Sequence, residues 1–339
     1  MDKKLKIAIA GTGSIGGYVG GALAANGHDV TLIGRASVLD SIRTHGITIT
    51  DFTGQNLFVP ATRLTLSEGP DAAAQADIVC VTVKSGHTAE IAAQLAPFLK
   101  ESAVVISLQN GVTNADTLRA ALPSITVLAG MVPYNVVQKG KGAFHRGTSG
   151  DIMIEAGQRI EGQPLADALS SADLSVIETT EIEAVLWGKL LINLNNALNA
   201  LSGVPLREEL MQRAWRLLLA DQIAEARGIL DQVGIAYRPA LPVPLNRFLT
   251  LLRLPDFLFR LVADRMIKVD PEARSSMWED FDRGRRTEID ELQGAIVALC
   301  KRHGLSAPLN GRIADLVREA EIAGEGSPRL TPTEVRGPL

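Results

Sequence analysis

The stretch GTGSIG at residues 11–16 constrains the fold of this chain more than any other part of its sequence. It ends an apolar run of strand length, LKIAIAG at residues 5–11, and opens a segment with apolar residues at helical spacing, Ile15, Val19 and Leu23. A strand that passes into a helix over G-x-G-x-x-G is typical of the first unit of a dinucleotide-binding domain. The position at the first strand–helix junction favours dinucleotide binding over a simple glycine turn.

The three glycines have separate physical roles in such a loop. Gly11 permits the tight turn, Gly13 lets the backbone approach a pyrophosphate, and Gly16 lets the helix pack close to the sheet. The free N–H groups and the positive dipole end of the helix then face the phosphates. We therefore predict that the whole loop binds the cofactor, through Gly11, Thr12, Gly13, Ser14, Ile15 and Gly16.

The first half of the chain alternates strands and helices. Apolar, β-branched runs of strand length occupy residues 29–34, 77–83 and 103–108, and residues 88–99 have helical periodicity. Such alternation predicts a parallel sheet that is covered on both faces. A further strand is expected at residues 126–132, and shorter late strands, with an antiparallel direction left open, at residues 142–147 and 151–156.

From about residue 180 onward the sequence is almost entirely helical, with strong segments at residues 207–233, 276–303 and 310–323. The predicted fold class is an α/β N-terminal Rossmann-type doubly wound sheet followed by an all-α C-terminal domain. The predicted domains are residues 1–180 and 181–330, with a loose tail at residues 331–339.

The stretch at residues 238–262 is punctuated by prolines and strongly apolar. We favour an irregular core or dimer segment, and the alternative is a lid over the substrate. A membrane span is not expected, because charged residues interrupt the stretch at Arg247, Arg253, Asp256 and Arg260.

Composition excludes several classes of function. The net charge is −4, with Lys+Arg 34 against Asp+Glu 38 and no basic run, so no nucleic-acid surface is expected. The N-terminus lacks the pattern of a signal peptide, which predicts a cytoplasmic protein with no membrane partner. Cys80 and Cys300 are expected to be buried thiols in a reducing compartment, and no ligand spacing predicts a metal site.

The end of the second predicted strand indicates which dinucleotide is bound. An NAD site usually has an acidic residue there, but this strand ends in Gly34 and Arg35. Arg35 suits the 2′-phosphate of NADP through charge-assisted hydrogen bonds, unless it is an ordinary surface arginine. Lys84 and Asn110 each follow a later strand at its carboxyl end, where open α/β sheets bind ligands. The alternatives are a solvated lysine and a common Asn-Gly turn.

Five motifs together resemble the ketopantoate reductase (2-dehydropantoate 2-reductase) family. They are IAGTGSIG, VKS, QNG, WGKLLIN and SSMWEDFDRGRRTEIDELQG, and the last two are the most specific. The resemblance runs over about residues 5–320. It implies NADPH-dependent reduction of a 2-oxo acid, in a cleft between a Rossmann domain and a helical domain.

The resemblance also implies roles for single residues. Lys189 matches the catalytic lysine that protonates the ketone oxygen, and Glu288 matches a glutamate near the reacting carbonyl. Asn193 and Ser276 match substrate-binding residues. The positions that match cofactor contacts are Arg35, Lys84 and Asn110.

The residues themselves agree with part of this assignment. Lys189 and Asn193 are four apart and would share a helix face. Asn196, seven residues after Lys189, would lie within about 20° of that face. Asn195 and Asn199 fall elsewhere and are expected to satisfy other partners. The alternative is a lysine that snorkels at a helix start beside capping asparagines.

Two assignments have structural rivals. Ser276 could instead cap a helix, because S-M-W-E has the form of a capping box with Glu279 at the third helical position. Glu288, expected three turns further along that helix, could instead belong to a charged surface. Burial would lower the pKa of Lys189 and Glu288 would raise it, and the sequence does not decide which effect dominates.

The sequence departs from the family pattern at one position. The family commonly has a second asparagine eight residues after the lysine, where this chain has Ala197, and the nearest amide is Asn196. Ketopantoate is the expected substrate, but the exact 2-oxo acid stays open. The alternatives are a 3-hydroxy acid or opine-type dehydrogenase and a non-catalytic NADP-binding sensor. The oligomeric state, a homodimer included, also stays open.

Overall fold

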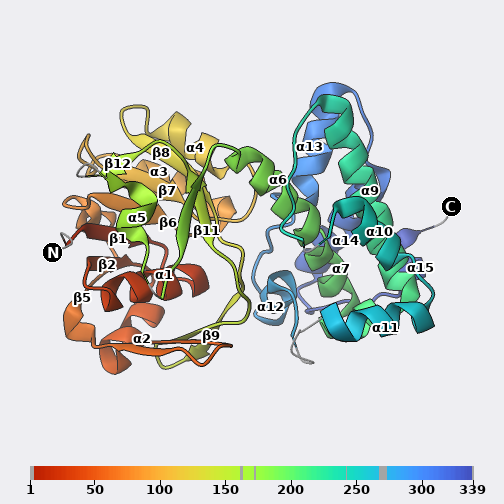
Figure 1. The fold of residues 1–339 in the computed structure, drawn as a ribbon, viewed down its shortest axis with the longest axis horizontal. Coiled ribbons are helices and arrows are strands. Elements are labelled where there is room, and N and C mark those ends of the chain that lie inside the picture. Colours follow the sequence, from red (N-terminus) through yellow and green to blue (C-terminus); the bar gives the residue numbers. More distant parts are fainter. Residues whose placement is uncertain (1–3, 161–162, 172, 242, 267–272, 338–339) are drawn as a thin grey trace. The chain divides into compact units, whose positions relative to one another are not determined.

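The computed structural model describes residues 4–160, 163–171, 173–241, 243–266 and 273–337 (Figure 1). The chain divides into two compact units, Met1–Glu183 and Ala184–Leu339. The first contains the predicted sheet, and the second is helical throughout its described residues. The predicted fold class, a Rossmann-type sheet followed by an all-α domain, is therefore confirmed.

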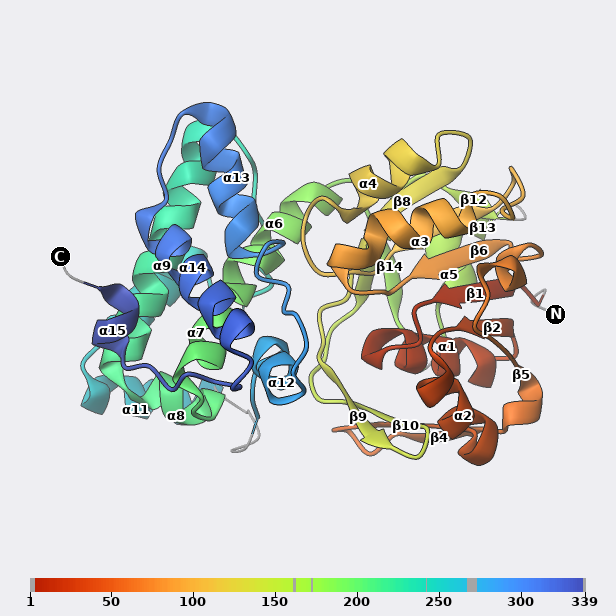
Figure 2. The same cartoon turned by 180° about the vertical axis from the view of Figure 1, so that it is seen from behind.

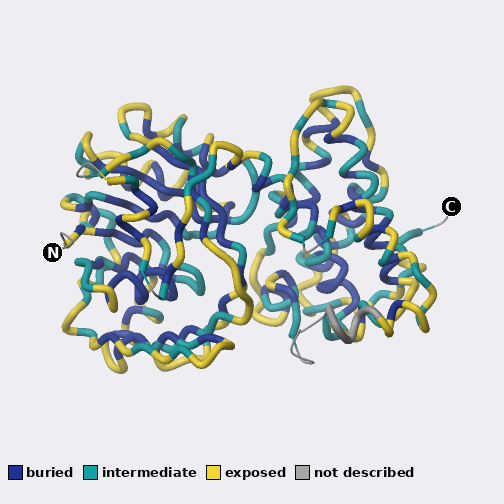
Figure 3. The backbone as a smooth tube through the Cα atoms, in the orientation of Figure 1, coloured by how far each residue is buried: buried dark blue, intermediate teal, exposed yellow. Residues whose placement is uncertain are grey.

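Within the described residues of the first unit, eight strands form one sheet in the order β14-β11-β8-β7-β6-β1-β2-β5. Every neighbouring pair is parallel except β8 and β11, which are antiparallel. The strands are β1 (Lys6–Ala10), β2 (Asp29–Ile33), β5 (Leu64–Ser67), β6 (Ile78–Val81), β7 (Val104–Ser107), β8 (Thr126–Met131), β11 (Ile152–Glu155) and β14 (Val176–Thr179). The central strands β6 and β7 are buried at every position (Figure 3), which explains their unbroken apolar sequences.

Helices cover both faces of this sheet, as the alternation predicted. Along β1, Ile7 and Ile9 point into a core shared with α1 (Ser14–Ala25) and α5 (Leu165–Leu169). Ala8 and Ala10 point to the opposite core, which contains residues of α3 (Thr88–Leu95) and α4 (Asn114–Ala121) (Figure 2). The period-two burial along one strand thus divides the apolar residues between two helical layers.

A second sheet, which the sequence analysis did not predict, covers the outer side of α1. Its order is β4-β3-β10-β9, and the inward residues include Ile49 and Phe144. Gly17 and Gly21 of α1 permit this contact, because a Cβ at Gly17 would lie 2.2 Å from the Phe144 ring. The remaining elements of the unit are α2 (Ala36–His45), β3 (Ile47–Asp51), β4 (Asn56–Val59), β9 (Val136–Gly140), β10 (Ala143–Arg146), β12 (Arg159–Ile160), β13 (Gln163–Pro164), and the short helices η1 (Ala61–Arg63), η2 (Pro70–Ala73) and η3 (Ser85–His87).

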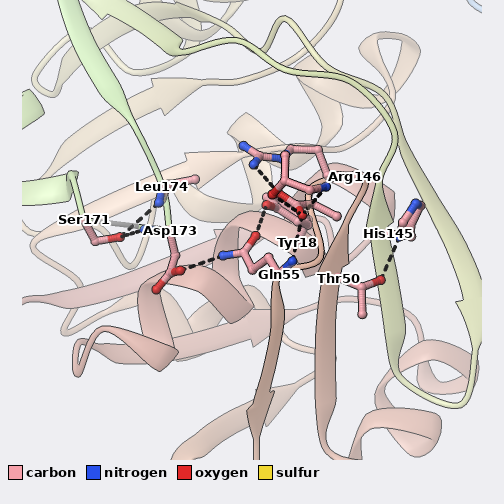
Figure 4. Close-up of polar contacts among 10 residues, drawn as sticks. Tyr18, Thr50, Gln55, His145, Arg146, Ser171, Asp173 and Leu174 are labelled. Atoms are coloured by element: carbon pink, nitrogen blue, oxygen red, sulfur yellow. Dashed lines mark hydrogen bonds and ion pairs between the residues drawn. The ribbon is translucent and has the colours of Figure 1, made fainter. Parts of the chain in front are cut away.

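A polar cluster joins the second sheet to α1 (Figure 4). Asp51 and Arg146 form an ion pair of 2.6 Å across β3 and β10, and the guanidinium lies 5.7 Å from the Tyr18 ring centre. The Tyr18 hydroxyl donates to Gln55 Oε1 at 3.2 Å, and Gln55 Nε2 donates to Asp173 at 2.8 Å. Burial alone would raise the pKa of Asp51. The carboxylate accepts hydrogen bonds from the Arg146 guanidinium and from backbone N–H groups, and these bonds hold its pKa well below the usual range.

The second unit contains the predicted helices, but several are interrupted. They are α6 (Ile182–Asn193), α7 (Asn195–Ser202), α8 (Leu206–Met211), α9 (Arg213–Val233), α10 (Leu245–Leu252), α11 (Asp256–Met266), α12 (Ser276–Asp282), α13 (Gln293–His303), α14 (Pro308–Ala323) and α15 (Pro332–Arg336). The prediction of one helix over residues 276–303 is wrong, because residues 283–292 form turns. Both cysteines are buried and free, as predicted. No helix among the described residues has the length and apolar character needed to cross a membrane.

A single buried arginine anchors much of the proline-rich stretch. Arg216 of α9 is 0% exposed and donates to the carbonyls of Leu252 and Leu254 at 3.1 and 2.8 Å. It also pairs with Asp256 at 2.9 Å, and its guanidinium lies 4.0 Å from the Phe259 ring centre. The described residues of the stretch are thus largely two short helices, α10 and α11, fixed to α9; residue 242 lies outside the described residues.

The expectation of a loose C-terminal tail is wrong for the described residues up to 337. Thr331 and Glu334 form a capping box that starts α15, and Val335 is 0% exposed. Arg336 pairs with Asp221 of α9 at 2.6 Å. A cap, one buried valine and an ion pair therefore attach this segment to the helical unit.

Candidate active site

The glycine loop has the geometry expected of a dinucleotide site. Gly11 has φ +114°, and a Cβ there would lie 2.5 Å from Val83 N, so only glycine fits. The N–H groups of Gly11 and Thr12 both donate to the Ile33 carbonyl, at 2.9 and 3.0 Å. The loop is therefore fixed to the carboxyl end of β2.

The start of α1 is open to an anionic ligand. Gly13 is the N-cap, no side chain caps the helix, and its first turn contains no acidic residue. A Cβ at Gly13 would meet no atom within 4 Å, whereas a Cβ at Gly16 would lie 2.2 Å from Gly11 O. The free space at Gly13 and the close packing at Gly16 leave room for a pyrophosphate at this helix start.

Arg35 lies where a ribose-binding residue is expected. It lies two residues after the end of β2, is exposed, and is the N-cap residue of α2. The described residues at the end of β2 include no acidic side chain that could bind a ribose hydroxyl. Asp29 lies at the start of the strand instead. The position is compatible with a contact to a 2′-phosphate.

The loops that carry Lys84 and Asn110 are joined by a buried polar network that the sequence analysis did not predict. Gln109 is 5% exposed and donates to the Val83 carbonyl at 3.0 Å and to Thr88 Oγ1 at 2.7 Å. Ser85 Oγ donates to the Asn110 carbonyl at 2.7 Å. Further bonds of the network include Thr88 Oγ1 to Asn114 Oδ1 at 2.7 Å and Asn114 Nδ2 to Ser85 Oγ at 3.1 Å. The network fixes the carboxyl ends of β6 and β7 relative to each other.

Lys189 is a partly buried residue in the last turns of α6. Burial lowers its pKa to about 8, and the Glu288 carboxylate opposes that shift. Desolvation thus exceeds the effect of the carboxylate, which answers the question that the sequence left open. Asn193, four residues further on the same helix, is also partly exposed.

The backbone beside Lys189 is tightly packed. A Cβ at Gly188 would lie 2.2 Å from the carbonyl carbon and oxygen of Arg238. The N–H of Arg238 donates to the Ala184 carbonyl at 2.7 Å. The beginning of the proline-rich stretch therefore lies directly on α6, and only glycine is compatible with that approach.

Asn199 connects three segments of the helical unit. Its Nδ2 donates to Glu209 at 2.8 Å and to the Val204 carbonyl at 2.9 Å, and its Oδ1 accepts from Ser275 N at 2.8 Å. Ser275 Oγ in turn donates to the Asn196 carbonyl at 3.0 Å. The amide of Asn199 thus fixes the start of α12 against α7.

The prediction that Ser276 could cap α12 is wrong. Ser275 is the N-cap, and its hydroxyl accepts from Trp278 N at 3.1 Å. Ser276 is the first helical residue and is exposed. The adjacent serines are indistinguishable by pattern, but the capping role belongs to Ser275 and the Ser276 hydroxyl is left for another contact.

Glu288 does not lie on a helix, contrary to the prediction. It belongs to the turns between α12 and α13 and is partly buried. Its carbonyl accepts from Glu291 N at 3.2 Å, and Thr287 N donates to Glu321 Oε1 at 2.6 Å. The turn brings the carboxylate near Lys189, whose pKa it affects.

Comparisons with known proteins place this chain in the class of nicotinamide-dependent oxidoreductases. The model of the family described as ketopantoate reductase PanE/ApbA matches residues 7–159, and the model of its C-terminal domain matches residues 181–321. The chain belongs to the ketopantoate reductase family.

Individual relatives agree with this assignment. A 2-dehydropantoate 2-reductase of Halobacterium salinarum is 29% identical over 94% of this chain and 100% of its own length. The crystal structure of a PanE/ApbA family ketopantoate reductase from Ralstonia eutropha JMP134 is 31% identical, with a TM-score of 0.80 over 95% of this chain and 100% of that one. A D-mandelate dehydrogenase solved with NADH and anilino(oxo)acetate has a TM-score of 0.76 at 21% identity, over 94% of this chain and 99% of that one, and shares the fold.

The buried carboxyl group of Glu209 generates a prediction about stability. Glu209 is 1% exposed, and burial raises its pKa from 4.5 to about 7, against the hydrogen bonds from Asn199, Ser202 and Asn195. Between those two values the folded protein holds a proton that the unfolded chain has lost. The free energy of unfolding should therefore fall as pH rises from 4.5 to about 7, by up to about 3 kcal/mol from this group.

Glu209→Gln should remove this contribution, so urea denaturation at pH 5 and pH 8 should show a smaller loss of stability than in the wild type. Glu208→Gln, on the exposed neighbour, is the matched control and should keep the wild-type pH dependence. Equal pH dependence in all three proteins would show that Glu209 titrates normally.

Proposed function

We propose that this protein reduces a branched 2-oxo acid with NADPH, and that its substrate is 2-dehydropantoate (ketopantoate), which yields pantoate for pantothenate biosynthesis. The observation that supports this most is the lowered pKa of Lys189, about 8, in a chain whose family and relatives bear the name of this reaction. We also propose that residues 1–180 bind the cofactor and residues 181–330 bind the substrate.

The residues of the first unit would hold the cofactor, which supplies the hydride when bound. Gly13 leaves room for the pyrophosphate at the start of α1. The other contacts would come from Arg35 at the 2′-phosphate and from Lys84 and Asn110, whose loops the buried network fixes.

Lys189 would donate the proton to the ketone oxygen as hydride reaches the adjacent carbon. A pKa of about 8 is close to physiological pH, where a general acid is most effective. Glu288 would keep the ammonium form populated, because its carboxylate raises the pKa that burial lowers. Asn193 and Ser276 would bind the substrate beside this lysine.

Asn196 would bind the hydroxyl group of ketopantoate. Ala197 is 0% exposed and lies in the core of the helical unit, so it cannot present a group to a ligand. Asn196 is partly exposed and is therefore the better candidate for that contact.

Replacement of the proposed acid tests the mechanism. Lys189→Ala should lower kcat about 10²–10⁴-fold, the usual range for a positioned acid, while NADPH binding stays nearly unchanged. The wild-type rate should fall as pH rises through about 8, because the ammonium form is lost, and the variant should lack this alkaline limb. Steady-state kinetics between pH 6 and pH 10 measures both. Wild-type turnover by Lys189→Ala would show that the lysine is structural, and NADPH binding without turnover of any 2-oxo acid by the wild type would favour a sensor.

The cofactor preference depends on Arg35. Arg35→Ala removes charge-assisted hydrogen bonds worth about 1.5–3 kcal/mol, so the Kd for NADPH should rise roughly ten- to hundredfold. The Kd for NADH, measured by the same fluorescence titration, should change little. An unchanged NADPH/NADH preference would contradict the assignment of Arg35.

The substrate assignment depends on Asn196. Asn196→Ala should lower kcat/KM for ketopantoate more than about tenfold, because the substrate hydroxyl then loses its hydrogen-bond partner in the site. The loss should be much smaller for 2-oxoisovalerate, which has the same branched carbon and no hydroxyl. Equal losses would show that Asn196 only supports the helix. Better wild-type turnover of 2-oxoisovalerate, or of 3-oxo acid or amino-acid-plus-oxo-acid substrates, would identify a different natural substrate.

A further inference from the structure

The carbonyl oxygen of Leu194 accepts hydrogen bonds from two buried glutamines. Gln222 Nε2 of α9 lies at 3.0 Å and Gln293 Nε2 of α13 at 2.8 Å, and both side chains are 0% exposed. This carbonyl lies at the junction of α6 and α7, between Asn193 and Asn196. Two buried amides thus converge on one carbonyl at the point where α6 ends and α7 begins.

Gln293 also ends the turn that carries Glu288. We call residues 287–294 the carboxylate turn. Its own bonds include Gly294 N to Ile289 O at 2.9 Å, Glu291 N to Glu288 O at 3.2 Å and Ile289 N to Thr287 Oγ1 at 3.2 Å. Ile289 is 1% exposed and Leu292 is 2% exposed, so apolar burial holds the turn on its inner side. The turn is a compact unit, and Gln293 connects it directly to the end of the helix that carries Lys189.

We propose that Gln293 is a positioning residue for the reaction: its hydrogen bond to the Leu194 carbonyl fixes the place of Glu288 relative to Lys189. The inference rests on the proposed function, in which Lys189 is the general acid. Gln222 binds the same oxygen from α9 and does not belong to the carboxylate turn, so it shares the bond without the positioning role.

The place of Glu288 has a measurable consequence, which is its effect on the pKa of Lys189. Among the described residues, Glu288 is the charged side chain that acts on the pKa of Lys189, and it raises that pKa against desolvation. Burial and the carboxylates of Glu288, Asp290 and Glu321 raise the pKa of the neighbouring Glu291, and Asp290 is paired with Arg318 at 2.6 Å. Because the attraction falls with distance, a turn that moves away from α6 leaves desolvation less opposed, and the pKa of Lys189 falls further below 8.

Three variants of the full-length protein test the proposal. Gln293→Met and Gln222→Met each remove one donor to the Leu194 carbonyl and keep a side chain of similar length, and Glu288→Gln removes the carboxylate itself. The alkaline limb of kcat should move to lower pH in Glu288→Gln and, by roughly half a unit to one unit, in Gln293→Met. That is about a three- to tenfold loss of rate at alkaline pH. In Gln222→Met the limb should stay at the wild-type pH.

A second readout does not depend on catalysis. Acylation of Lys189 by acetic anhydride, followed by mass spectrometry across pH, reports the pKa of the lysine in cofactor-free protein, because only the neutral amine reacts. The pKa of Lys189 is expected to fall in Glu288→Gln and in Gln293→Met, and to stay at the wild-type value in Gln222→Met. Gln293→Asn, which keeps the amide but shortens its reach, replaces Gln293→Met if that variant does not fold.

The outcomes separate the two proposals. A Lys189 pKa that moves in Glu288→Gln but stays at the wild-type value in the Gln293 variants would overturn the positioning role alone. A shift of equal size in Gln222→Met would overturn it too, since the effect would then follow any loss of a bond to Leu194. A lysine that titrates as expected in a protein with no alkaline limb would leave the positioning role standing and refute the proposed function.

Discussion

Buried side-chain amides, each of which needs hydrogen-bond partners, determine how the segments of this protein meet. In the helical unit Gln222 and Gln293 bind one carbonyl, and Asn199 binds Glu209, Val204 and Ser275 together. In the first unit Gln109 and Asn114 join the loops after β6 and β7. Leaving a buried amide without a hydrogen-bond partner costs about 1–3 kcal/mol of stability. Each of these bonds therefore disfavours other conformations of the backbone segments that it joins. Lys84 and Asn110 in the first unit, and Asn193, Asn196 and Glu288 in the second, lie on or next to segments that these amides fix.

Close backbone approach plays the corresponding role around α1. Glycines on this helix let it lie against β1 on one side and against the second sheet on the other, with Phe144 over Gly17 and Ile49 over Gly21. The helix is therefore held on two sides, and its N-terminus is fixed by the bonds of Gly11 and Thr12 to β2. The packing behind the glycine loop therefore restricts its conformation, although no side chain caps the helix.

The sequence predicted those parts whose cause is local. The apolar strands, the glycine loop and the boundary between α/β and helical regions follow from periodicity and from short motifs. The second sheet was missed because its strands bury only one face and because its two local hairpins, β3–β4 and β9–β10, pair with each other over a long separation, as Thr50 and His145 do. The break at Leu194 was missed as well, and the two glutamines that bind its carbonyl could not be paired with it from sequence, because they come from distant helices. Ser275 and Ser276 carry the same pattern, and only the fold shows which one caps α12. The lysine was found by family resemblance, whereas its lowered pKa depends on burial that no short motif encodes.

The anchoring of α10 and α11 by Arg216 has a consequence for how the helical unit opens. One guanidinium satisfies the carbonyls of Leu252 and Leu254 and the carboxylate of Asp256, so neither helix can detach without leaving a buried cation short of acceptors. Independent fraying of either helix is therefore suppressed, and the pair would unfold as one cooperative block together with the adjoining part of α9. Amide protons in α10 and α11 would then exchange with solvent at a common rate, although the two helices are short and separated by a proline.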